Sequence, residues 1–314
     1  MTEALRIFDV RRPGAEEIME AVGLIGRGID FDKWRPLLHF GLSEVSARVG
    51  RQMVDRLCEA YMAEEELSEV EAELIALLQQ AAAMFTWLRV IPTLDAQHDE
   101  AGRGKRLGEN EKGLTALQEY KDEENIRRMA LEATDALLRR LDAGDYPFWT
   151  ETDEFKRRSQ CLIRSKGEFD GFYRLSSHLV FEMIMPIMEE VQYAVIVSAL
   201  GRSRFDSLLE QRDDPALLKA AQWPLALLTM AKAFRRLSAE VLPGGVTQLQ
   251  MSQPVASRIR AEKEAREAAA AELEDSGRDA LRRLEQLVAE LDRDVEPVDI
   301  FSRKHIAHSK GFSF

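Results

Sequence analysis

Apolar residues recur at spacings of three and four along most of the chain, the pattern that predicts amphipathic helices rather than strands. The clearest stretch runs from about residue 31 to residue 61. Six apolar positions there share one helical face: Leu38, Leu42, Val45, Val49, Met53 and Leu57. Similar patterns predict helices over 68–91, 114–141, 215–242 and 254–293. The chain is therefore expected to be all-α, with long helices packed through their apolar faces.

A second segment, from about residue 181 to residue 211, repeats the first at a shift of about 150 residues, and such self-similarity indicates an internal duplication. The matches before one inserted residue are Phe31 with Phe181, Pro36 with Pro186, Leu38 with Met188 and Val45 with Val195. Those after it are Gly50-Arg51 with Gly201-Arg202 and Leu57 with Leu208. In the helices that follow, Leu74-Ile75 and Gln79 match Leu217-Leu218 and Gln222. Two tandem helical repeats are expected, with Val45 and Val195 as equivalent buried positions. The alternative is that long amphipathic helices resemble each other by composition.

Glycine and proline divide the helical segments. Four glycines punctuate residues 92–113, which predicts a long loop or a small β-hairpin, and residues 246–251 read as a short strand. We expect the segments 92–113 and 243–252 to lie near each other. The predicted organisation is an N-terminal lead-in (1–30), a first helical repeat (31–144), a hinge and linking helix (145–180), a second repeat ending in a long charged helix (181–295), and a basic aromatic tail (296–314).

Composition narrows the class of protein. A hydrophobic content of 45% with 31% charged residues is typical of a soluble, folded chain. The net charge of −12 argues against a general nucleic-acid binder, which needs a basic face. Cys58 and Cys161 lie in apolar helical contexts, so no disulfide is expected. The first ten residues lack the apolar core of a secretory signal, and the apolar runs near 191–200 and 223–230 are too short to cross a bilayer.

The polar residues form no recognisable catalytic or metal-binding pattern. None of the five histidines follows a glutamate at the spacing of a helical di-metal site. His39 and His178, near the starts of long helices, are interpreted as partly buried packing or capping residues. The glycine-rich segment 102–106 lacks the first glycine and the Ser or Thr of a phosphate loop. No catalytic, cofactor-binding or metal-binding residue is therefore predicted, and an enzyme with an unrecognised carboxylate site stays as an alternative.

The two C-terminal segments have features suited to contacts with other chains. The apolar stripe of the last helix either packs on its own bundle or forms a seam between subunits. Residues 301–314 carry three aromatic and three cationic side chains and no acidic one: Phe301, Arg303, Lys304, Lys310, Phe312 and Phe314. Since aromatic residues are depleted in purely solvating tails, we expect this tail to dock in extended form on an adjacent subunit or on the next ring. The alternative is ordinary terminal disorder.

The stretch 135–211 resembles a family of functionally uncharacterised proteins encoded in phages and prophages of Bacteroidetes bacteria. The residues that carry the resemblance are Asp135-Ala136-Leu137-Leu138, Leu141, Phe148-Trp149, Phe169-Asp170, Tyr173, Pro186, Glu189-Glu190 and Gly201. Leu94-Asp95 and the glycine-rich loop that follows also fit. Members usually lie among virion structural genes, which implies a head–tail connector, neck or tail-completion protein, and no catalytic residues are carried over.

Together, the repeats and the resemblance lead to the expectation of a non-enzymatic virion structural protein. The expected form is a head–tail connector or neck adaptor ring, assembled in the bacterial host cytoplasm. Its expected partners are further copies of itself in a ring homo-oligomer and the portal and tail proteins, without sequence-specific nucleic acid, membrane or cofactor. The alternative is a helical assembly chaperone or scaffolding module that is not retained in the particle.

Overall fold

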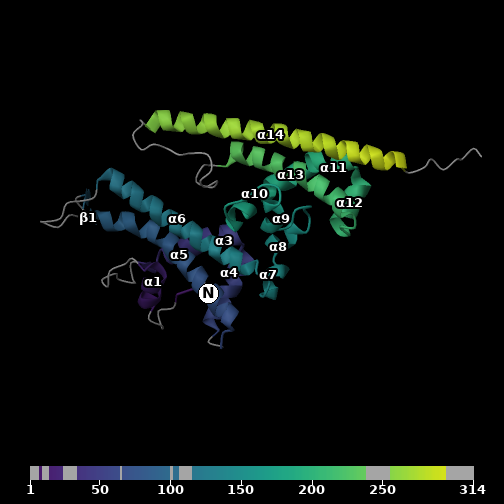
Figure 1. Cartoon of the computed structure of the whole chain (residues 1–314). Helices are drawn as coiled ribbons and strands as arrows, with labels where there is room; N and C mark the ends of the chain where they lie inside the picture. Colours follow the sequence, from purple (N-terminus) through teal and green to yellow (C-terminus); the bar gives the residue numbers. More distant parts are fainter. Residues whose placement is uncertain are drawn as a thin grey trace, which may run out of the picture.

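The computed structural model describes residues 7–8, 14–23, 34–63, 66–99, 102–105, 115–237 and 255–294. This part of the chain is all-α apart from one pair of short strands, and it forms two helical halves joined near the middle (Figure 1). The first half consists of α1 (Gly14–Val22), α3 (Leu38–Val49), α4 (Arg51–Met62), α5 (Glu69–Asp95) and α6 (Ala116–Leu141). Three short helices connect the halves: α7 (Pro147–Glu151), α8 (Asp153–Arg158) and α9 (Lys166–Asp170). The second half consists of α10 (His178–Val191), a π-helical turn (Gln192–Ile196), α11 (Val197–Leu200), α12 (Arg202–Glu210), α13 (Pro215–Arg236) and α14 (Val255–Asp294).

Each half has its own apolar core. In the first half, α3, α4 and α6 pack around α5, and the indole of Trp34 stacks on that of Trp87 with ring centroids 5.2 Å apart. Ile7 and Phe8 are also buried in this core, so these two residues of the predicted lead-in belong to the first half. In the second half, α10 and α14 pack against α13. The all-α class predicted from the apolar periodicity is therefore confirmed.

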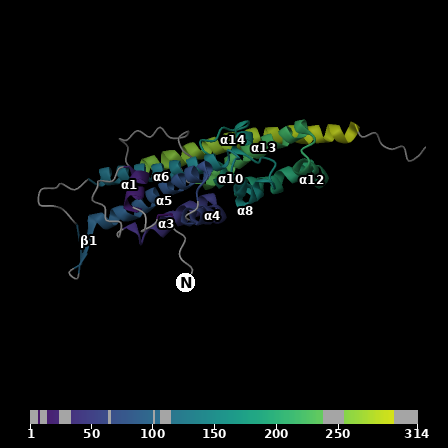
Figure 2. The same ribbon diagram turned by 90° about the horizontal axis from the view of Figure 1, so that it is seen from below.

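The long helix α14 packs along α13, and Figures 1 and 2 show the two side by side. Its apolar stripe, which includes Leu284 and Val288, faces the second core. Gly277 allows the close approach, because a Cβ at this position would lie 2.8 Å from the Cγ and Cδ2 atoms of Leu228. The stripe therefore packs within its own half, as one of the two sequence-based interpretations expected, and α14 continues through Gly277.

Two glycines interrupt helices that the sequence presented as continuous. The predicted helix over 31–61 breaks at Gly50, where φ is +106° and ψ is +141°, and α4 starts at the next residue. The predicted helix over 181–211 breaks at Gly201 with φ +75° and ψ +148°, and α12 starts at the next residue. Residues with a side chain rarely adopt such positive φ values. The apolar periodicity passes through both positions and gave no sign of either break.

The π-helical turn changes the register of the second half. A π-helix places one extra residue in a turn relative to an α-helix. Val45 is fully buried, but Val195 lies within the π-helical turn and is only partly buried. Its neighbour Ile196 is fully buried instead. The expectation that Val45 and Val195 are both core residues is therefore wrong for Val195, because the extra residue turns the helix surface by part of a turn.

The described strands lie beyond the end of α5. Strand β1 (Ala96–Asp99) pairs antiparallel with β2 (Gly102–Lys105), within the segment for which a loop or hairpin was predicted. Pro92 lies inside α5, so this helix does not end before the proline as the pattern suggested. The predicted strand at 246–251 and its expected proximity to 92–113 lie outside the described residues. Helix α13 ends at Arg236, before the predicted residue 242.

Two described stretches, Glu69–Thr93 and His178–Leu200, are long and apolar enough to cross a membrane by length and composition alone. The predicted absence of such stretches counted uninterrupted apolar runs and missed them. Both stretches contribute many side chains to the two cores, as the central helices of soluble proteins also do.

Candidate functional site: a buried charge cluster between the halves

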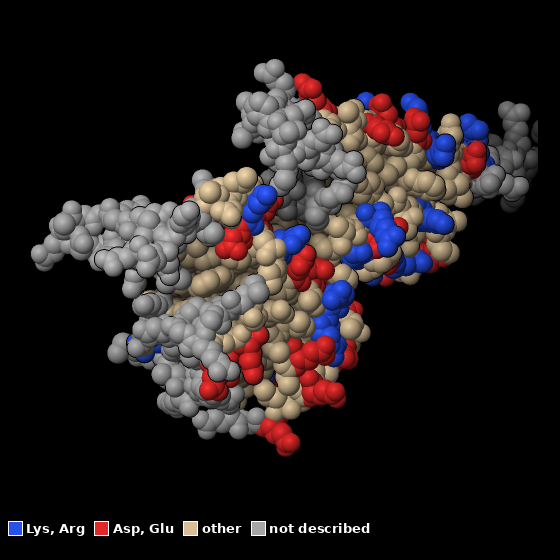
Figure 3. Space-filling view, turned by 60° about the vertical axis from the view of Figure 1, so that its left-hand side comes forward, with Lys and Arg blue, Asp and Glu red and all other residues tan. Residues whose placement is uncertain are grey.

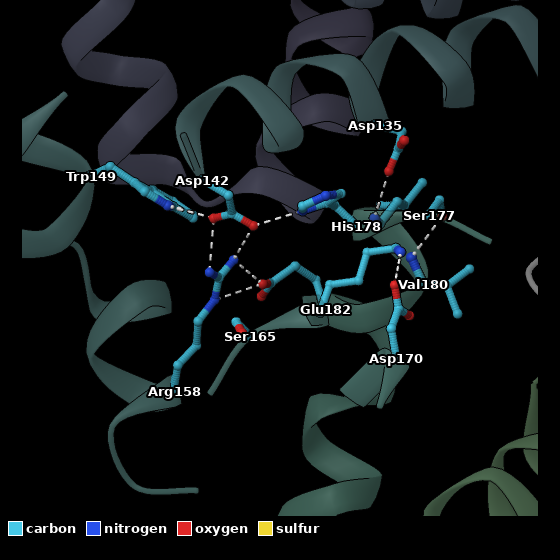
Figure 4. A network of polar contacts seen from close by, with 12 residues as sticks. Asp135, Asp142, Trp149, Arg158, Ser165, Asp170, Ser177, His178, Val180 and Glu182 are labelled. Carbon is cyan, nitrogen blue, oxygen red and sulfur yellow. Dashed lines mark hydrogen bonds and ion pairs between the residues drawn. The ribbon is translucent and has the colours of Figure 1, made fainter. Parts of the chain in front are cut away.

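The most unusual polar feature of the described residues is a cluster of charged side chains at the junction of the two halves (Figure 4). We call it the Arg158 cluster, and its members are Asp142, Trp149, Arg158, His178 and Glu182. They come from four places: the C-terminal end of α6, α7, the last residue of α8, and the first turns of α10. The cluster therefore connects the first half to the second through the linking helices.

Asp142 is the hub of the cluster on the side of the first half. Its carboxylate accepts hydrogen bonds from Trp149 Nε1 at 2.9 Å, Arg158 Nη1 at 2.8 Å and His178 Nδ1 at 2.8 Å. Asp142 sits at the C-cap of α6, where helix carbonyls make a carboxylate unfavourable. The three donors supply the compensating interactions, so α6 ends at a point that α7, α8 and α10 all contact.

Arg158 is the cation that the cluster surrounds, and its side chain is only 5% exposed. The guanidinium group pairs with Asp142 on one side, and its Nε donates to Glu182 Oε1 at 2.9 Å on the other. Its Cζ atom lies 5.3 Å from the ring centroids of Trp149 and Phe155 and 5.6 Å from that of Phe181. A planar guanidinium suits this position, because it can form bidentate ion pairs and stack on aromatic rings at once.

Burial and ion pairing have opposite effects on the pKa of a carboxylate, and their balance differs between Asp142 and Glu182. Burial alone raises the pKa of Asp142, but the hydrogen bond with His178 and the charge and hydrogen bond of Arg158 outweigh it, and the pKa is lowered. Burial raises the pKa of Glu182, and Arg158 offsets this only in part. The charges of Asp142 and Glu182 also repel each other across the guanidinium. Asp142 is thus the firmly ionised partner of Arg158.

Helix α10 belongs to both cores, which explains why its first turn is fixed so firmly. Leu179 is buried in the first core and Met183 packs against it, whereas Val180 and Phe181 are buried in the second core. The backbone N–H of Leu179 donates to Asp135 Oδ1 on α6 at 3.0 Å. Ser177 caps the helix by accepting a hydrogen bond from the backbone N–H of Val180 at 3.1 Å.

The charged groups of the cluster pair with one another. A histidine with a carboxylate on Nδ1 occurs in catalytic triads, where the other ring nitrogen faces a nucleophile. Within the described part of the chain, no hydroxyl or thiol hydrogen-bonds to the ring of His178. The described residues also contain no group of three or more metal-ligating side chains. Each charged group of the cluster instead has its partner inside it.

The residues singled out from the sequence have mixed outcomes. His178 is partly buried at the first position of α10, as expected, but its role in the Arg158 cluster was missed. His39 was expected to be partly buried and is instead exposed, with its ring against Phe40. Both cysteines are buried and unpaired. The predicted docking residues of the tail, Phe301 to Phe314, lie outside the described residues.

Sequence reasoning missed Asp142, Arg158 and Glu182 because charged residues on helical surfaces are common, and spacing does not reveal which ones face a partner. Arg158 and Glu182, for example, pair across 24 residues of chain. Trp149 offered one signal. A large aromatic residue in a short polar link between two helical segments indicates that the link is packed rather than solvated.

The fold and the cluster define an all-helical protein of two halves joined by a buried ionic joint. A family of unknown function (DUF6712) matches residues 49–159, about a third of the chain. The matched region runs from the Gly50 break through α8, so it includes Asp142, Trp149 and Arg158 but neither His178 nor Glu182. No curated protein matches the chain. No solved structure matches it either.

Proposed function

We propose that this chain is a non-enzymatic structural protein of a phage or phage-like particle, acting as a head–tail connector or neck adaptor that forms a ring. The observation that carries the proposal is the Arg158 cluster, which fixes two helical halves as one unit. A ring subunit must keep a fixed angle between the surfaces that contact its two neighbours, because small angular errors prevent closure. The resemblance of residues 135–211 to phage-encoded proteins supports the particle assignment.

We infer further that the two halves descend from one repeated unit. The glycines at the two helix breaks, Gly50 and Gly201, share a positive φ and are each followed by arginine. The single-residue change in alignment falls at the π-helical turn, where a residue can be inserted without ending the helix. In each half, a long helix pair then follows the break: α5 with α6, and α13 with α14.

Two glutamines at matching positions support the same inference. Gln79 Nε2 on α5 donates to the backbone carbonyl of Ile7 at 2.9 Å. Gln222 Nε2 on α13 donates to the backbone carbonyl of Leu162 at 2.8 Å. Both acceptors lie in buried apolar segments that precede the long helices of their halves. The repeated unit then begins near residue 7 in the first half and near residue 162 in the second, earlier than the sequence boundaries of 31 and 181.

A repeated unit suits a ring adaptor, because two similar halves in one subunit offer two similar contact surfaces. The contacts between subunits of a ring are head-to-tail, so one surface of each subunit meets a different surface of the next. In the proposed particle, the ring would contact portal protein on one side and tail protein on the other.

Light scattering coupled to size-exclusion chromatography tests the ring. The full chain, with a subunit mass of 35.7 kDa, should form a stable closed oligomer of roughly six to twelve subunits, visible as rings by electron microscopy. A monomer or dimer across the accessible concentration range would contradict the ring and favour the assembly chaperone. Co-purification of the full chain with portal or tail proteins encoded beside it would support its assignment to a phage or phage-like particle.

A further inference from the structure

The end of the first half carries an apolar surface that its own fold does not use. Leu117 and Tyr120, in the first turns of α6, are each 62% exposed, the highest exposure among the large apolar side chains described. Leu117 lies nine residues before the buried Ile126, about two and a half helical turns, which places it on the opposite side of α6 from the core. Packing on α5 therefore gives no reason for leucine at this position.

Acidic side chains accompany the two apolar ones. Residues 116–124 contain four acidic side chains, at Glu119, Asp122, Glu123 and Glu124, against the single cation Lys121. Acidic residues commonly stabilise the first turn of a helix. Those at Asp122, Glu123 and Glu124 lie beyond that turn and are exposed, so the surface combines apolar anchors with negative charge. We call residues 117–124 the arm surface.

The chain contains a segment with the complementary chemistry. Residues 301–314 provide three phenylalanines and three cations without an acidic residue, and they follow α14 by six residues. Aromatic side chains are the usual anchors of small interfaces, and opposite charge fixes their register and speeds association. The proposed tail docking thus has a matching receptor on the same polypeptide.

The arrangement of the helices indicates which copy provides that receptor. In Figures 1 and 2, α14 starts on the side of the arm surface and ends on the opposite side of the molecule, and the start of α6 lies beyond the start of α14. With 40 residues, α14 is about 60 Å long. Phe312 lies 18 residues after Asp294, a reach of at most about 65 Å. Docking on the arm of the same molecule would need a fully extended return along all of α14.

The face that Figure 3 shows has positive and negative side chains interspersed over the described surface. Along α14 itself, for example, Arg278 pairs with Glu274 and Arg282 pairs with Asp279. Such paired charges offer an incoming basic segment no net negative field. The arm surface differs because its three exposed acidic residues beyond the first turn, Asp122, Glu123 and Glu124, outnumber its one cation and lie close in sequence to the exposed apolar side chains.

We propose that the tail segment 301–314 of one copy docks on the arm surface of the neighbouring copy, with Leu117 and Tyr120 receiving its phenylalanines. The contact is head-to-tail, as a ring requires, so this inference rests on the proposed function and names the surface through which neighbours meet.

Site-specific cross-linking of full-length chains tests the contact. Two single variants, Tyr120→Cys and Phe312→Cys, are co-expressed so that both assemble into the same oligomers, purified together and treated with a short bismaleimide. The native thiols do not compete, because both are buried and burial raises the pKa of Cys58 and Cys161 to about 12. The expected product is a covalent dimer in which peptide mass spectrometry finds the 120–312 link. In the matched control, Arg51→Cys replaces Tyr120→Cys. The Arg51 side chain is 85% exposed, and we expect no link between positions 51 and 312.

A second pair of variants separates a specific contact from chance collision. Adding Leu117→Ser to the Tyr120→Cys chain should lower the yield of the 120–312 link by roughly tenfold or more, since an apolar anchor is lost. Adding Arg128→Ser, an exposed change farther along α6, should leave the yield unchanged. Raising the salt concentration should also lower the yield, because exposed charges are screened.

Each contrary outcome has a defined meaning. A 120–312 link within one chain that carries both Tyr120→Cys and Phe312→Cys would place the tail on its own arm and overturn the proposal. Links that join position 120 of one Tyr120→Cys chain to position 120 of another would show that arm surfaces contact each other. Equal yields with and without Leu117→Ser would show that Leu117 does not anchor the tail. If the wild-type chain forms the oligomer but no 120–312 link appears, the contact is wrong and the ring stands. If the wild-type chain stays monomeric and no link forms, both proposals fail.

Discussion

Replacing Arg158 with methionine would test whether the Arg158 cluster holds the two halves together. Methionine keeps much of the apolar stem against the aromatic rings and removes the positive charge. Asp142 and Glu182 would then face each other in a largely buried site without their common cation. Removing one partner of a buried ion pair typically costs about 3–5 kcal/mol. Because folded domains are stable by only about 5–15 kcal/mol, a large part of the free energy of unfolding would be lost.

Two companion variants show whether the loss comes from stranded charges. Arg51→Met removes an arginine that is 85% exposed and pairs with Asp55 at 3.2 Å, and exposed pairs of this kind contribute at most about 1 kcal/mol. The combination of Arg158→Met, Asp142→Asn and Glu182→Met removes the charges of all three residues together. Replacing a buried ionic group by neutral side chains is often near neutral, so this combination should recover most of the stability that Arg158→Met loses.

Thermal and urea unfolding, followed by far-ultraviolet circular dichroism, measure these differences. We expect Arg158→Met to lower Tm by roughly 6–15 °C and Arg51→Met to leave it nearly unchanged. If Arg158→Met unfolds within about 1 kcal/mol of the wild type, buried pairing does not stabilise the joint and the reasoning fails. If the triple variant is no more stable than Arg158→Met, the loss arises from packing rather than from uncompensated charge.

Three further predictions follow from the backbone and the carboxylates. Gly50→Ala should destabilise the protein more than Gly201→Ala in urea unfolding. Both substitutions impose a positive φ on alanine. However, a Cβ at Gly50 would lie 2.3 Å from Cδ of Glu154, whereas a Cβ at Gly201 would have no atom within 4 Å. Equal losses would mean that Glu154 moves aside freely. Gly277→Ala should lower Tm despite a gain of about 1 kcal/mol in helix propensity, because it would push α13 and α14 apart, and a raised Tm would contradict the close packing. Ionised Asp142 has a lowered pKa, so its stabilisation is complete above the ordinary value of 3.8 and is lost as pH falls through the lower folded value. Asp142→Asn should therefore show a weaker loss of stability in this acidic range than the wild type, and identical acid limbs would refute the assignment.

The sequence by itself determined the helical class and most helix positions. Core side chains of α5 and α6 recur at the helical period because each helix buries one face, so periodicity reports burial directly. The start of α6 could be placed to within two residues, since Thr115 and Gln118 form a capping box whose residue types favour a helix start. The proposed alignment of Gly50 with Gly201, with its one-residue insertion, also comes from the sequence alone.

Only the tertiary structure decided where the helices break and which polar residues matter. The apolar faces of the segments around Gly50 and Gly201 continue in phase across each break, so periodicity cannot distinguish a kink from a straight helix. Within the π-helical turn, Ile196 is fully buried and Val195 only partly, because a single extra residue rotates every following side chain about the axis. The Arg158 cluster depends on how the linking helices and α10 pack against the end of α6. Its charges are ordinary helical surface residues until that packing removes water from around them, and sequence spacing holds no record of burial between distant segments.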